Sequence, residues 1–321
     1  MEFSQFIHCF QSLIILFLAL LIDIIFGEPH EKLHPTVWMG KTIQLLKSRL
    51  RHRNPLIEKI YGIFLATFVI TIFSMISYFF LKYLAYLSSI AYIAISAMLL
   101  KTTFAIKSMK LHSIPIAKEL SSKNLINAKK LLKKIVRRDV NKLNEELIVS
   151  ATMESIAEGT VDGITSPLFY FAIFGVPGSI AYRAINTLDS MVGYKDLEHV
   201  NIGWFSAKLD TIANYIPARV TALLMIITAW LIKEDWRRSF SILKRDRNKT
   251  ESLNAGWPMS AMAGILNVKL EKLGHYALGD SNTTLSWRCI NKALKIMDIT
   301  VVLFLFFIVI PMVVLFNLIV Q

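Results

Sequence analysis

The stretch that decides the fold is Ile60–Leu81, which reads IYGIFLATFVITIFSMISYFFL and contains no charged residue. An α-helix needs about 20 apolar residues to cross the hydrocarbon core of a bilayer, so this stretch predicts a transmembrane helix. The whole chain agrees with that prediction, because 54% of its 321 residues are hydrophobic. Such a composition is too apolar for an ordinary soluble domain.

Further apolar stretches lie on both sides of Ile60–Leu81. Leu84–Leu100 follows after little more than Lys82 and Tyr83, which predicts a close pair of spans. The other candidate spans are Phe6–Phe26, the shorter Pro217–Ile232 and the final Ile299–Val320. Ser166–Ala181 is apolar but broken by Gly and Pro residues, which favours a re-entrant or interfacial segment. With no strand periodicity in sight, the sequence predicts an all-α, polytopic integral membrane protein with four to six spans plus re-entrant or interfacial helices.

The distribution of basic residues predicts the topology. The net charge is +13, and the excess is concentrated in Lys101–Lys142 and in the loop that follows the first span. Loops rich in Lys and Arg face the cytoplasm and attract anionic membrane lipid. We therefore expect a multi-pass protein of the cell membrane with its N-terminus outside. Nucleic-acid binding is not expected, because the basic run lacks interleaved aromatic residues. The opening segment lacks the basic leader of a cleaved signal peptide.

These features predict a single membrane-embedded domain over residues 1–321. Within it we expect a basic, cytosolic amphipathic segment at 101–150, a catalytic core segment at 151–219 and a cytosolic loop region at 233–298. In the first of these segments, the alternation of Leu, Ile and Lys over Lys123–Glu146 predicts one amphipathic helix.

Three carboxylates recur at four-residue spacing in the core segment, in ESIAEGTVD at 154–162. At 3.6 residues per turn, Glu154, Glu158 and Asp162 fall along one side of a helix and repel one another unless a cation compensates them. A solvated surface helix is the simpler interpretation, but the apolar and glycine neighbours disfavour it. Since Mg²⁺ prefers oxygen ligands that it shares with substrate phosphate, we expect a metal or phosphate role.

Two further boxes combine arginine, amide and carboxylate side chains. The residues are Arg183, Asn186 and Asp189, followed by Tyr194, and then Lys208, Asp210, Asn214 and Arg219. An Arg–Asp pair within one helix is worth only a few tenths of a kcal/mol. The planar guanidinium also binds carboxylate or phosphate, and Asn and Asp can complete the coordination of a cation. Three such boxes in so short a stretch predict a polar site that handles phosphate.

Two outlying segments are less easily interpreted. Asp23 lies at the end of the first span, where a carboxylate is costly unless it caps a helix, forms an ion pair or has a function. His30 and His34 have the spacing of metal ligands on a helix, but the neighbouring prolines disfavour a continuous helix and hence a zinc site. Asn254-Ala-Gly256 either packs helices tightly or turns backbone N–H groups toward an anion, and the sequence leaves both interpretations open.

Together these segments resemble the adenosylcobinamide-phosphate synthase (CobD/CbiB) family of cobalamin biosynthesis, and the resemblance runs from about Leu20 to Asp280. Its most specific part is Tyr182–Tyr194. The supporting segments are Asp23–Gly40, Arg138-Asp139, Glu154–Gly163, Pro167–Phe169, Lys208–Arg219 and Asn254–Gly264. The chain departs from the family pattern at Gly159, where an Asn is expected, and at Leu253, where a Pro is expected.

The resemblance implies a membrane-bound acid–amine ligase with its active site facing the cytosol. Such enzymes join a propionate carboxylate of the corrinoid adenosylcobyric acid to (R)-1-aminopropan-2-ol or its O-phosphate, with ATP as co-substrate and Mg²⁺. No P-loop is present, so the mode of nucleotide binding stays open. The oligomeric state stays open too, with a homo-oligomer among the alternatives.

The family match identifies positions, and we assign roles to these positions as hypotheses. Catalytic residues would be Glu154, Glu158, Asp162, Arg183, Asn186 and Asp189. Metal ligands would be Glu154, Glu158, Asp162 and Asp189. Substrate binding would fall to Asp23, His34, Tyr194, Lys208, Asp210, Asn214, Arg219 and Asn254.

Two other classes compete with this interpretation. A Mg²⁺-dependent membrane transferase acting on lipid phosphates would also use acidic helices, but the spacing of the carboxylates differs from the boxes of those enzymes. A membrane transporter would use Asp23 and the acidic helix as an ion path, but no pair of matching halves supports it.

Overall fold

The structure is a computed structural model that describes residues 3–48 and 54–319, so Val320, at the end of the last predicted span, lies outside the described residues. Helices make up most of the described chain and the two strands are only three residues long, which confirms the prediction of an all-α polytopic membrane protein. The chain folds into two compact units. The first unit contains Met1–Ala105, Ser166–Ala213 and Phe307–Gln321, and the second contains Ile106–Thr165 and Asn214–Phe306. The expectation of one membrane-embedded domain stays a prediction.

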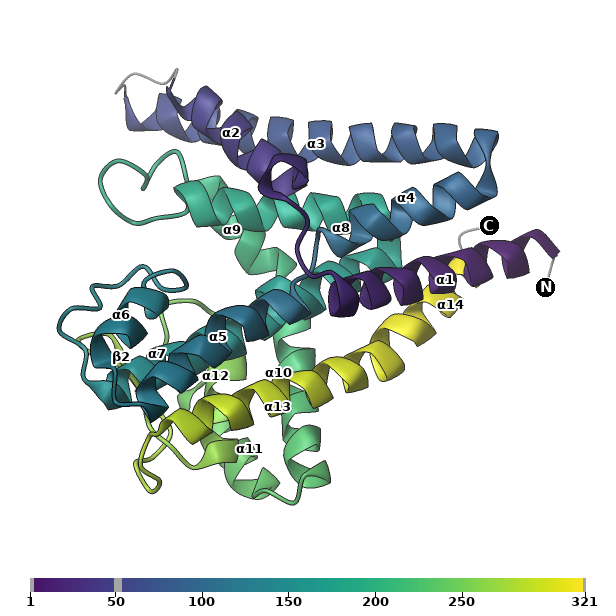
Figure 1. The fold of residues 1–321 in the computed structure, drawn as a ribbon. Helices are drawn as coiled ribbons and strands as arrows, with labels where there is room; N and C mark the ends of the chain where they lie inside the picture. Colours follow the sequence, from purple (N-terminus) through teal and green to yellow (C-terminus); the bar gives the residue numbers. More distant parts are fainter. Residues whose placement is uncertain (1–2, 49–53, 320–321) are drawn as a thin grey trace. The chain divides into compact units, whose positions relative to one another are not determined.

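The first unit is built around α8. Its elements are α1 (Phe3–Ile25), the 3₁₀ turn η1 (Glu31–Leu33), α2 (Pro35–Ser48), α3 (Pro55–Leu87), α4 (Ser89–Lys101), α8 (Ser166–Val192), α9 (Trp204–Ala213) and α14 (Ile310–Ile319). Helix α8 packs against α2, α3, α4 and α9, and α1 packs against α4 and α14. Figure 1 shows α3 and α4 as consecutive helices joined by a tight connection.

The connection between α3 and α4 lies later than the sequence suggested. Lys82 and Tyr83 are inside α3, and the break falls at Ser88. Ser88 has an extended conformation and its hydroxyl accepts a hydrogen bond from the backbone N–H of Ala91, as an N-cap does. The predicted loop at Lys82 was therefore wrong, because both residues there are tolerated in a helix and Ser88 supplies the signal that ends it.

Helix α8 contains the break that the sequence indicated. Gly175 has φ 65° and ψ −161°, values that a residue with a side chain rarely adopts. Pro177 lies two residues later, where its missing N–H costs little because the helix restarts there. The predicted interruption of Ser166–Ala181 is confirmed at Gly175. A re-entrant path through a membrane stays a prediction.

The second unit holds the remaining helices and a small hairpin. Its elements are α5 (Ile106–Ser121), α6 (Leu125–Leu132), α7 (Glu145–Thr160), the π-helical turn η2 (Val161–Thr165), α10 (Tyr215–Leu231), α11 (Trp236–Asp246), α12 (Gly256–Leu266), β1 (Leu270–Lys272), β2 (Tyr276–Leu278) and α13 (Trp287–Phe304). A second π-helical turn, η3 (Leu305–Val309), follows α13. Strands β1 and β2 pair antiparallel, with Leu270 opposite Leu278, and three-residue strands are too short to show a periodicity in the sequence.

The amphipathic helix predicted over Lys123–Glu146 is wrong. Only α6 is helical in its first part, capped by the Asn124 side chain, and α7 begins after the Asn144 cap. The two asparagines are helix-start signals that the alternation of Leu and Lys concealed. The chain between the two helices carries Arg138, which is important for the site described below.

Four helical segments are long and apolar enough to cross a membrane: Pro55–Leu87, Ser89–Ser121, Glu145–Val192 and Trp287–Phe316. Trp204–Ala213 and Tyr215–Leu231 would make a fifth if this pair, which is bent by 43°, counts as one span. Phe10–Ile25 is apolar but shorter. The number agrees with the predicted four to six spans.

A buried carboxylate fixes the end of α11. Asp246 is fully buried and accepts hydrogen bonds from Arg245 Nε at 2.8 Å and from the backbone N–H of Gly279 at 2.8 Å, and Lys249 Nζ lies 2.6 Å from it. Burial would raise the pKa of Asp246, but these donors lower it to about 2. The network ties α11 to the residue that follows the hairpin.

This lowered pKa predicts how stability depends on pH. An unfolded Asp titrates near about 3.9, so the stabilisation by the ionised Asp246 carboxylate is fully present above that value and is lost as the pH falls through about 2. Asp246→Asn is therefore expected to lower the free energy of unfolding at pH 7. The difference from the wild type should shrink between about pH 5 and pH 2. Denaturant unfolding of the full chain in detergent across this range measures it, with the half-exposed Asp298→Asn as control. A difference that is constant with pH would contradict the role of Asp246.

Candidate functional site

The buried carboxylate of Glu154 lies at the centre of a polar cluster in the second unit. Its side chain is 3% exposed, and it forms a salt bridge with Arg138. Ser150 Oγ donates to Glu154 Oε1 at 2.7 Å, and the Tyr276 hydroxyl donates to Oε2 at 2.7 Å. Helix α7 supplies Ser150 and Glu154 one turn apart, strand β2 supplies Tyr276, and the segment before α7 supplies Arg138. Three donors therefore hold one carboxylate in a fixed orientation.

The Tyr276 hydroxyl stays protonated in this cluster. Burial raises the pKa of Tyr276 well above its usual value, and the neighbouring carboxylate of Glu154 raises it further. Glu158 acts in the same direction, which places its charge close to Tyr276. Tyr276 is therefore a hydrogen-bond donor at neutral pH and not a base.

The three carboxylates of the predicted row differ in their surroundings. Glu154 is buried, Glu158 is exposed and Asp162 is half-buried. The row is also not one α-helix, because α7 ends at Thr160 and Asp162 lies in the π-helical turn η2. A π turn advances by more residues than an α turn, so Asp162 leaves the four-residue register that the sequence suggested. The expectation of one continuous helical row is corrected here.

The fit of this row to a metal ion is partial. Within the residues that the structure describes, no group of three or more His, Cys, Asp and Glu side chains is placed to hold a metal. Both oxygens of Glu154 already accept hydrogen bonds from other side chains. Glu158 and Asp162 have the right donor chemistry for Mg²⁺, which commonly takes one or two carboxylates and completes its shell with substrate phosphate and water. The assignment of metal ligands stays a prediction.

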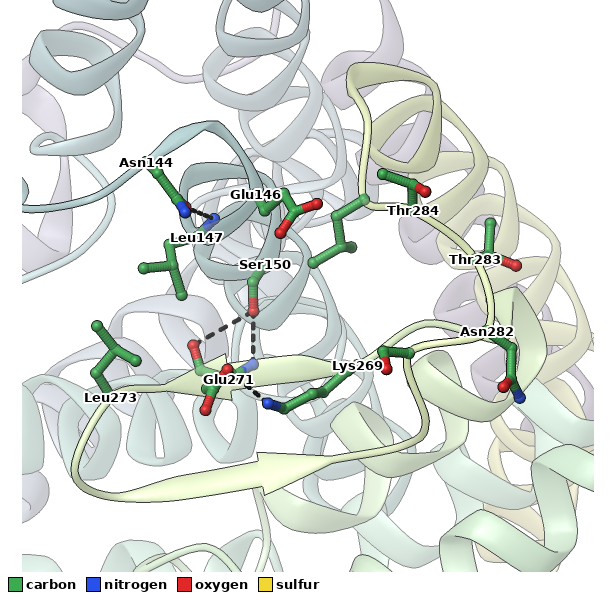
Figure 2. A pocket seen from close by; sticks show the side chains of 12 residues that line it. Asn144, Glu146, Leu147, Ser150, Lys269, Glu271, Leu273, Asn282, Thr283 and Thr284 are labelled. Carbon is green, nitrogen blue, oxygen red and sulfur yellow. Dashed lines mark hydrogen bonds and ion pairs between the residues drawn. The ribbon is translucent and has the colours of Figure 1, made fainter.

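A cavity of about 400 Å³ adjoins the Glu154 cluster in the second unit. Figure 2 shows its lining: Asn144, Glu146 and Ser150 come from the start of α7, and Lys269 and Glu271 from β1 and the residue before it. Ser150 connects the two features, because its hydroxyl accepts from the backbone N–H of Glu271 at 2.8 Å and donates to Glu154.

The chemistry of this cavity suits a small charged molecule. The Lys269 ammonium and the Glu271 carboxylate are 2.8 Å apart, and the hydroxyl-bearing residues Ser281, Thr283 and Thr284 also belong to the lining. Its volume lies at the lower end of the range for small-molecule sites. No sequence spacing pointed to it, since its lining comes from two segments far apart in the chain.

The first unit brings two of the predicted boxes together. Arg183 Nη1 donates to Asn186 Oδ1 at 3.2 Å, and Asn186 Nδ2 donates to Asp210 Oδ1 at 3.5 Å. Helices α8 and α9 pack against each other and so place Asn186 beside Asp210. Arg183 Nε is buried and has no hydrogen-bond partner in the described part of the chain. A buried donor of this kind is costly unless a ligand satisfies it.

The remaining predicted residues of the first unit, at the end of α8 and in α9, have contacts within the protein. A Cβ on Gly193 would collide with the carboxylate and the carbonyl of Asp189, so the glycine allows the chain to close over Asp189. The Tyr194 hydroxyl donates to the Ser190 carbonyl at 2.5 Å. The Lys208 ammonium lies 4.5 Å from the centre of the Trp204 ring. Asp189, Tyr194 and Lys208 therefore stay candidates, without a geometry that assigns them a role.

Asp23 and His34 belong to an ionic network of the first unit, in which Asp23 and Lys101 are buried and Glu28 is exposed. Lys101 is 2% exposed, and its ammonium lies 3.1 Å from Asp23 Oδ1 and 3.2 Å from Glu28 Oε1. His34 Nε2 donates to Glu28 Oε2 at 3.0 Å, while its Nδ1 accepts from the backbone N–H of Thr36. Although burial raises the pKa of Glu28, the hydrogen bond from His34 and the charge of Lys101 lower it below its ordinary value. These contacts favour pairing as the reason for a carboxylate at the end of the first apolar helix.

Arg219 and Asn254 meet in the second unit. Arg219 Nη1 donates to Asn254 Oδ1 at 2.7 Å, and Nη2 donates to the Leu253 carbonyl at 3.3 Å. Asp210 lies in α9, which ends at Ala213, and Asn214 lies just before α10, which starts at Tyr215. Substrate binding by these residues stays a prediction.

Sequence reasoning missed three residues of these clusters. Lys101 was counted within the basic run, although a lysine that directly follows an apolar span was a usable signal. Ser150 lies one turn before Glu154 and could have been found by spacing. No local pattern pointed to Tyr276, because it reaches Glu154 only through the hairpin.

Comparisons with known proteins agree with the resemblance. The family model described as CobD/Cbib protein matches residues 16–306. The chain is 40% identical to the probable cobalamin biosynthesis protein CobD of Thermoplasma acidophilum over 94% of this chain and 98% of that protein. It is 39% identical to the cobalamin biosynthesis protein CobD of Dehalococcoides mccartyi over 90% of this chain and 93% of that protein.

A third relative is similar over a smaller part of both chains. The cobalamin biosynthesis protein CobD of Pelobacter propionicus is 39% identical over 80% of this chain and 79% of its own length. No solved structure matches the chain. Since the family model and these relatives cover almost the whole length, the chain is a helical membrane protein that belongs to the CobD/CbiB family of cobalamin biosynthesis enzymes.

Proposed function

We propose that the protein forms an amide bond between a propionate carboxylate of adenosylcobyric acid and (R)-1-aminopropan-2-ol or its O-phosphate, giving adenosylcobinamide or its phosphate. The observation that carries this proposal is the match to the CobD/CbiB family over residues 16–306. Nothing in the structure favours a lipid-phosphate transferase or a transporter. In particular, the Asp23 carboxylate is paired with Lys101.

The reaction needs an activated carboxylate, because a carboxylate and an amine form a salt and not an amide. We propose that a propionate oxygen attacks the γ-phosphorus of ATP, giving an acyl phosphate and ADP. The amine nitrogen then attacks the acyl carbon, inorganic phosphate leaves with the bridging oxygen, and the nitrogen loses a proton to a base. Mg²⁺ bound to the nucleotide would neutralise phosphate charge, with Glu158 and Asp162 as its protein ligands. Since ATP is made in the cytosol, the site would face the cytosol.

The second unit offers residues for the remaining tasks. Arg138 is held by Glu154 and keeps further N–H groups for an anionic group such as the acyl phosphate, while Tyr276 donates its single hydroxyl proton to Glu154 and so helps to fix that carboxylate. The cavity beside Ser150 would take the amine, with Glu146 and Glu271 attracting its ammonium group and Lys269 attracting a phosphate where one is present. The corrinoid is far too large for this cavity, so only the small substrate is assigned to it.

The test is a reaction with the purified full chain in detergent. Adenosylcobyric acid, ATP, Mg²⁺ and either the free or the phosphorylated amine are incubated, and the amide product is measured by mass spectrometry. We expect product with at least one amine, and none without ATP. Glu158→Ala and Asp162→Ala, which remove the proposed ligands of the metal, should each lower turnover by about a hundredfold while the protein remains folded. The proposal would be contradicted if folded protein, supplied with lipid, gave no product with either amine.

An isotope label tests the activation step separately. With ¹⁸O in the propionate carboxylate, one labelled oxygen should appear in the released inorganic phosphate. Label in AMP instead would mean attack on the α-phosphorus, and the acyl phosphate would then be excluded.

A further inference from the structure

Two arginines of the second unit share a single tryptophan. The guanidinium carbons of Arg219, in α10, and Arg247, which directly follows α11, each lie 4.9 Å from the centre of the Trp257 ring in α12. Arg219 also stacks on Tyr215 at 3.6 Å. Helix α12 packs against both α10 and α11, so the fold itself brings the three side chains together. All three are half-buried.

Neither guanidinium is neutralised by a carboxylate among the residues that the structure describes. The hydrogen bonds of Arg219 go to uncharged oxygens of Tyr215, Leu253 and Asn254. Arg245, only two residues before Arg247, shows the contrast, because it pairs with Asp246 at 2.8 Å and with Asp280 at 2.9 Å. Acidic partners are therefore supplied to a neighbouring arginine but not to this pair. Two positive charges on one ring repel each other unless an anion joins them.

The backbone adds positive potential at the same place. Helices α10 and α12 begin at Tyr215 and Gly256, and neither has a side-chain hydrogen bond that caps its N-terminus. Arg219 lies about one turn into α10, and Trp257 is the second residue of α12. Helix N-termini attract anions through their free N–H groups. A structural role at the C-terminus of α11 explains a cation at position 247, but it does not explain why that cation lies over Trp257.

We propose that Arg219, Arg247 and Trp257 form a binding site for a phosphate-bearing anion. Guanidinium groups bind phosphate oxygens in pairs, and the indole between them holds two such groups at a fixed separation. A nucleotide polyphosphate and the phosphate of a lipid headgroup share this chemistry. With the nucleotide as the source, the inference rests on the proposed function and places the ATP phosphates, for which the sequence holds no P-loop.

Binding experiments test the site without requiring any amide to form. Inorganic tripolyphosphate is titrated into the purified full chain in detergent by calorimetry. Arg247→Gln is expected to weaken binding about tenfold or more, and Arg247→Lys, which keeps the charge but loses the planar fork, to weaken it less. Arg237→Gln is the matched control, because Arg237 lies in α11 and faces Trp236 alone at 5.4 Å. The control removes the same charge and should leave the affinity unchanged.

A second arm distinguishes the lipid from the nucleotide. The wild type and the Arg247→Gln variant are reconstituted in nanodiscs of phosphatidylcholine with phosphatidylglycerol, and the retained phosphatidylglycerol is measured. If Arg247→Gln loses only tripolyphosphate binding, the result supports a nucleotide as the natural ligand. If it loses only the retained phosphatidylglycerol, the result supports a lipid headgroup as the ligand.

Equal behaviour of Arg247→Gln and the wild type in both arms would overturn the proposal. Should Arg247→Gln fail to fold, Arg247→Lys decides in its place. A protein that binds tripolyphosphate through Arg247 but makes no amide would refute only the proposed function.

Discussion

Replacing Glu154 with glutamine is expected to lower the rate of amide formation by about a hundredfold or more. The carboxylate orients Arg138 and Tyr276, and glutamine keeps an acceptor oxygen for them but loses the negative charge that holds the Arg138 guanidinium. The same change leaves the half-buried Arg138 without its ionised partner, which costs about 3 to 5 kcal/mol where an ion pair is fully buried and less here. The turnover of the folded fraction and its denaturant midpoint are measured together.

Two variants separate an effect on the reaction from an effect on folding. Tyr276→Phe removes one donor and no charge, so the rate should fall while the stability changes little. Glu145→Gln alters an exposed carboxylate in the first turn of the same helix and should change neither quantity appreciably. A Glu154→Gln enzyme with the turnover of the wild type would refute the place of this cluster in catalysis.

Replacing Lys101 with methionine is expected to destabilise the protein by about 3 kcal/mol or more. The change keeps the length of the side chain but leaves the carboxylates of Asp23 and Glu28 without their common cation. Unfolding in detergent measures the loss. Lys110→Met is the matched control, because Lys110 pairs with Asp298 where both side chains are more than one-third exposed, and such pairs contribute about 0 to 1 kcal/mol.

A second substitution tests the cause of that loss. Asp23→Asn combined with Lys101→Met removes one of the two carboxylates that have lost their cation. The double variant should therefore be more stable than Lys101→Met alone. If the double variant loses the sum of the two single losses, Asp23 and Lys101 do not act as a pair.

Hydropathy predicted the long helices well because an apolar run of sufficient length has few alternatives. Ile60–Leu81 lies wholly inside α3, whereas Leu84–Leu100 is divided between the end of α3 and α4. The run at Pro217–Ile232 lies almost wholly in α10, and the described part of Ile299–Val320 passes through α13, η3 and α14. Helix ends were predicted less well, since they depend on single capping residues such as Ser88 and Asn144. The alternation of Leu and Lys in Lys123–Glu146 imitated a helix that these signals interrupt.

The candidate site could be predicted only where its contacts follow helical spacing. Arg183 and Asn186 are three residues apart on one helix and do meet. Arg138 with Glu154, and Lys101 with Asp23, are contacts between separate elements, which depend on packing that no local spacing encodes. The sequence therefore indicated which polar residues are unusual, and the fold determined which of them are partners.

The Lys101–Asp23 contact has a consequence for how the chain is made. A ribosome completes α1, which carries Asp23, well before it reaches Lys101, the last residue of α4. During that interval the nascent segment carries an acidic group whose later counter-ion does not yet exist. If α1 enters lipid before α4 is complete, its carboxylate does so without the cation that neutralises it in the folded protein, which is the costly situation for an acidic group in a bilayer.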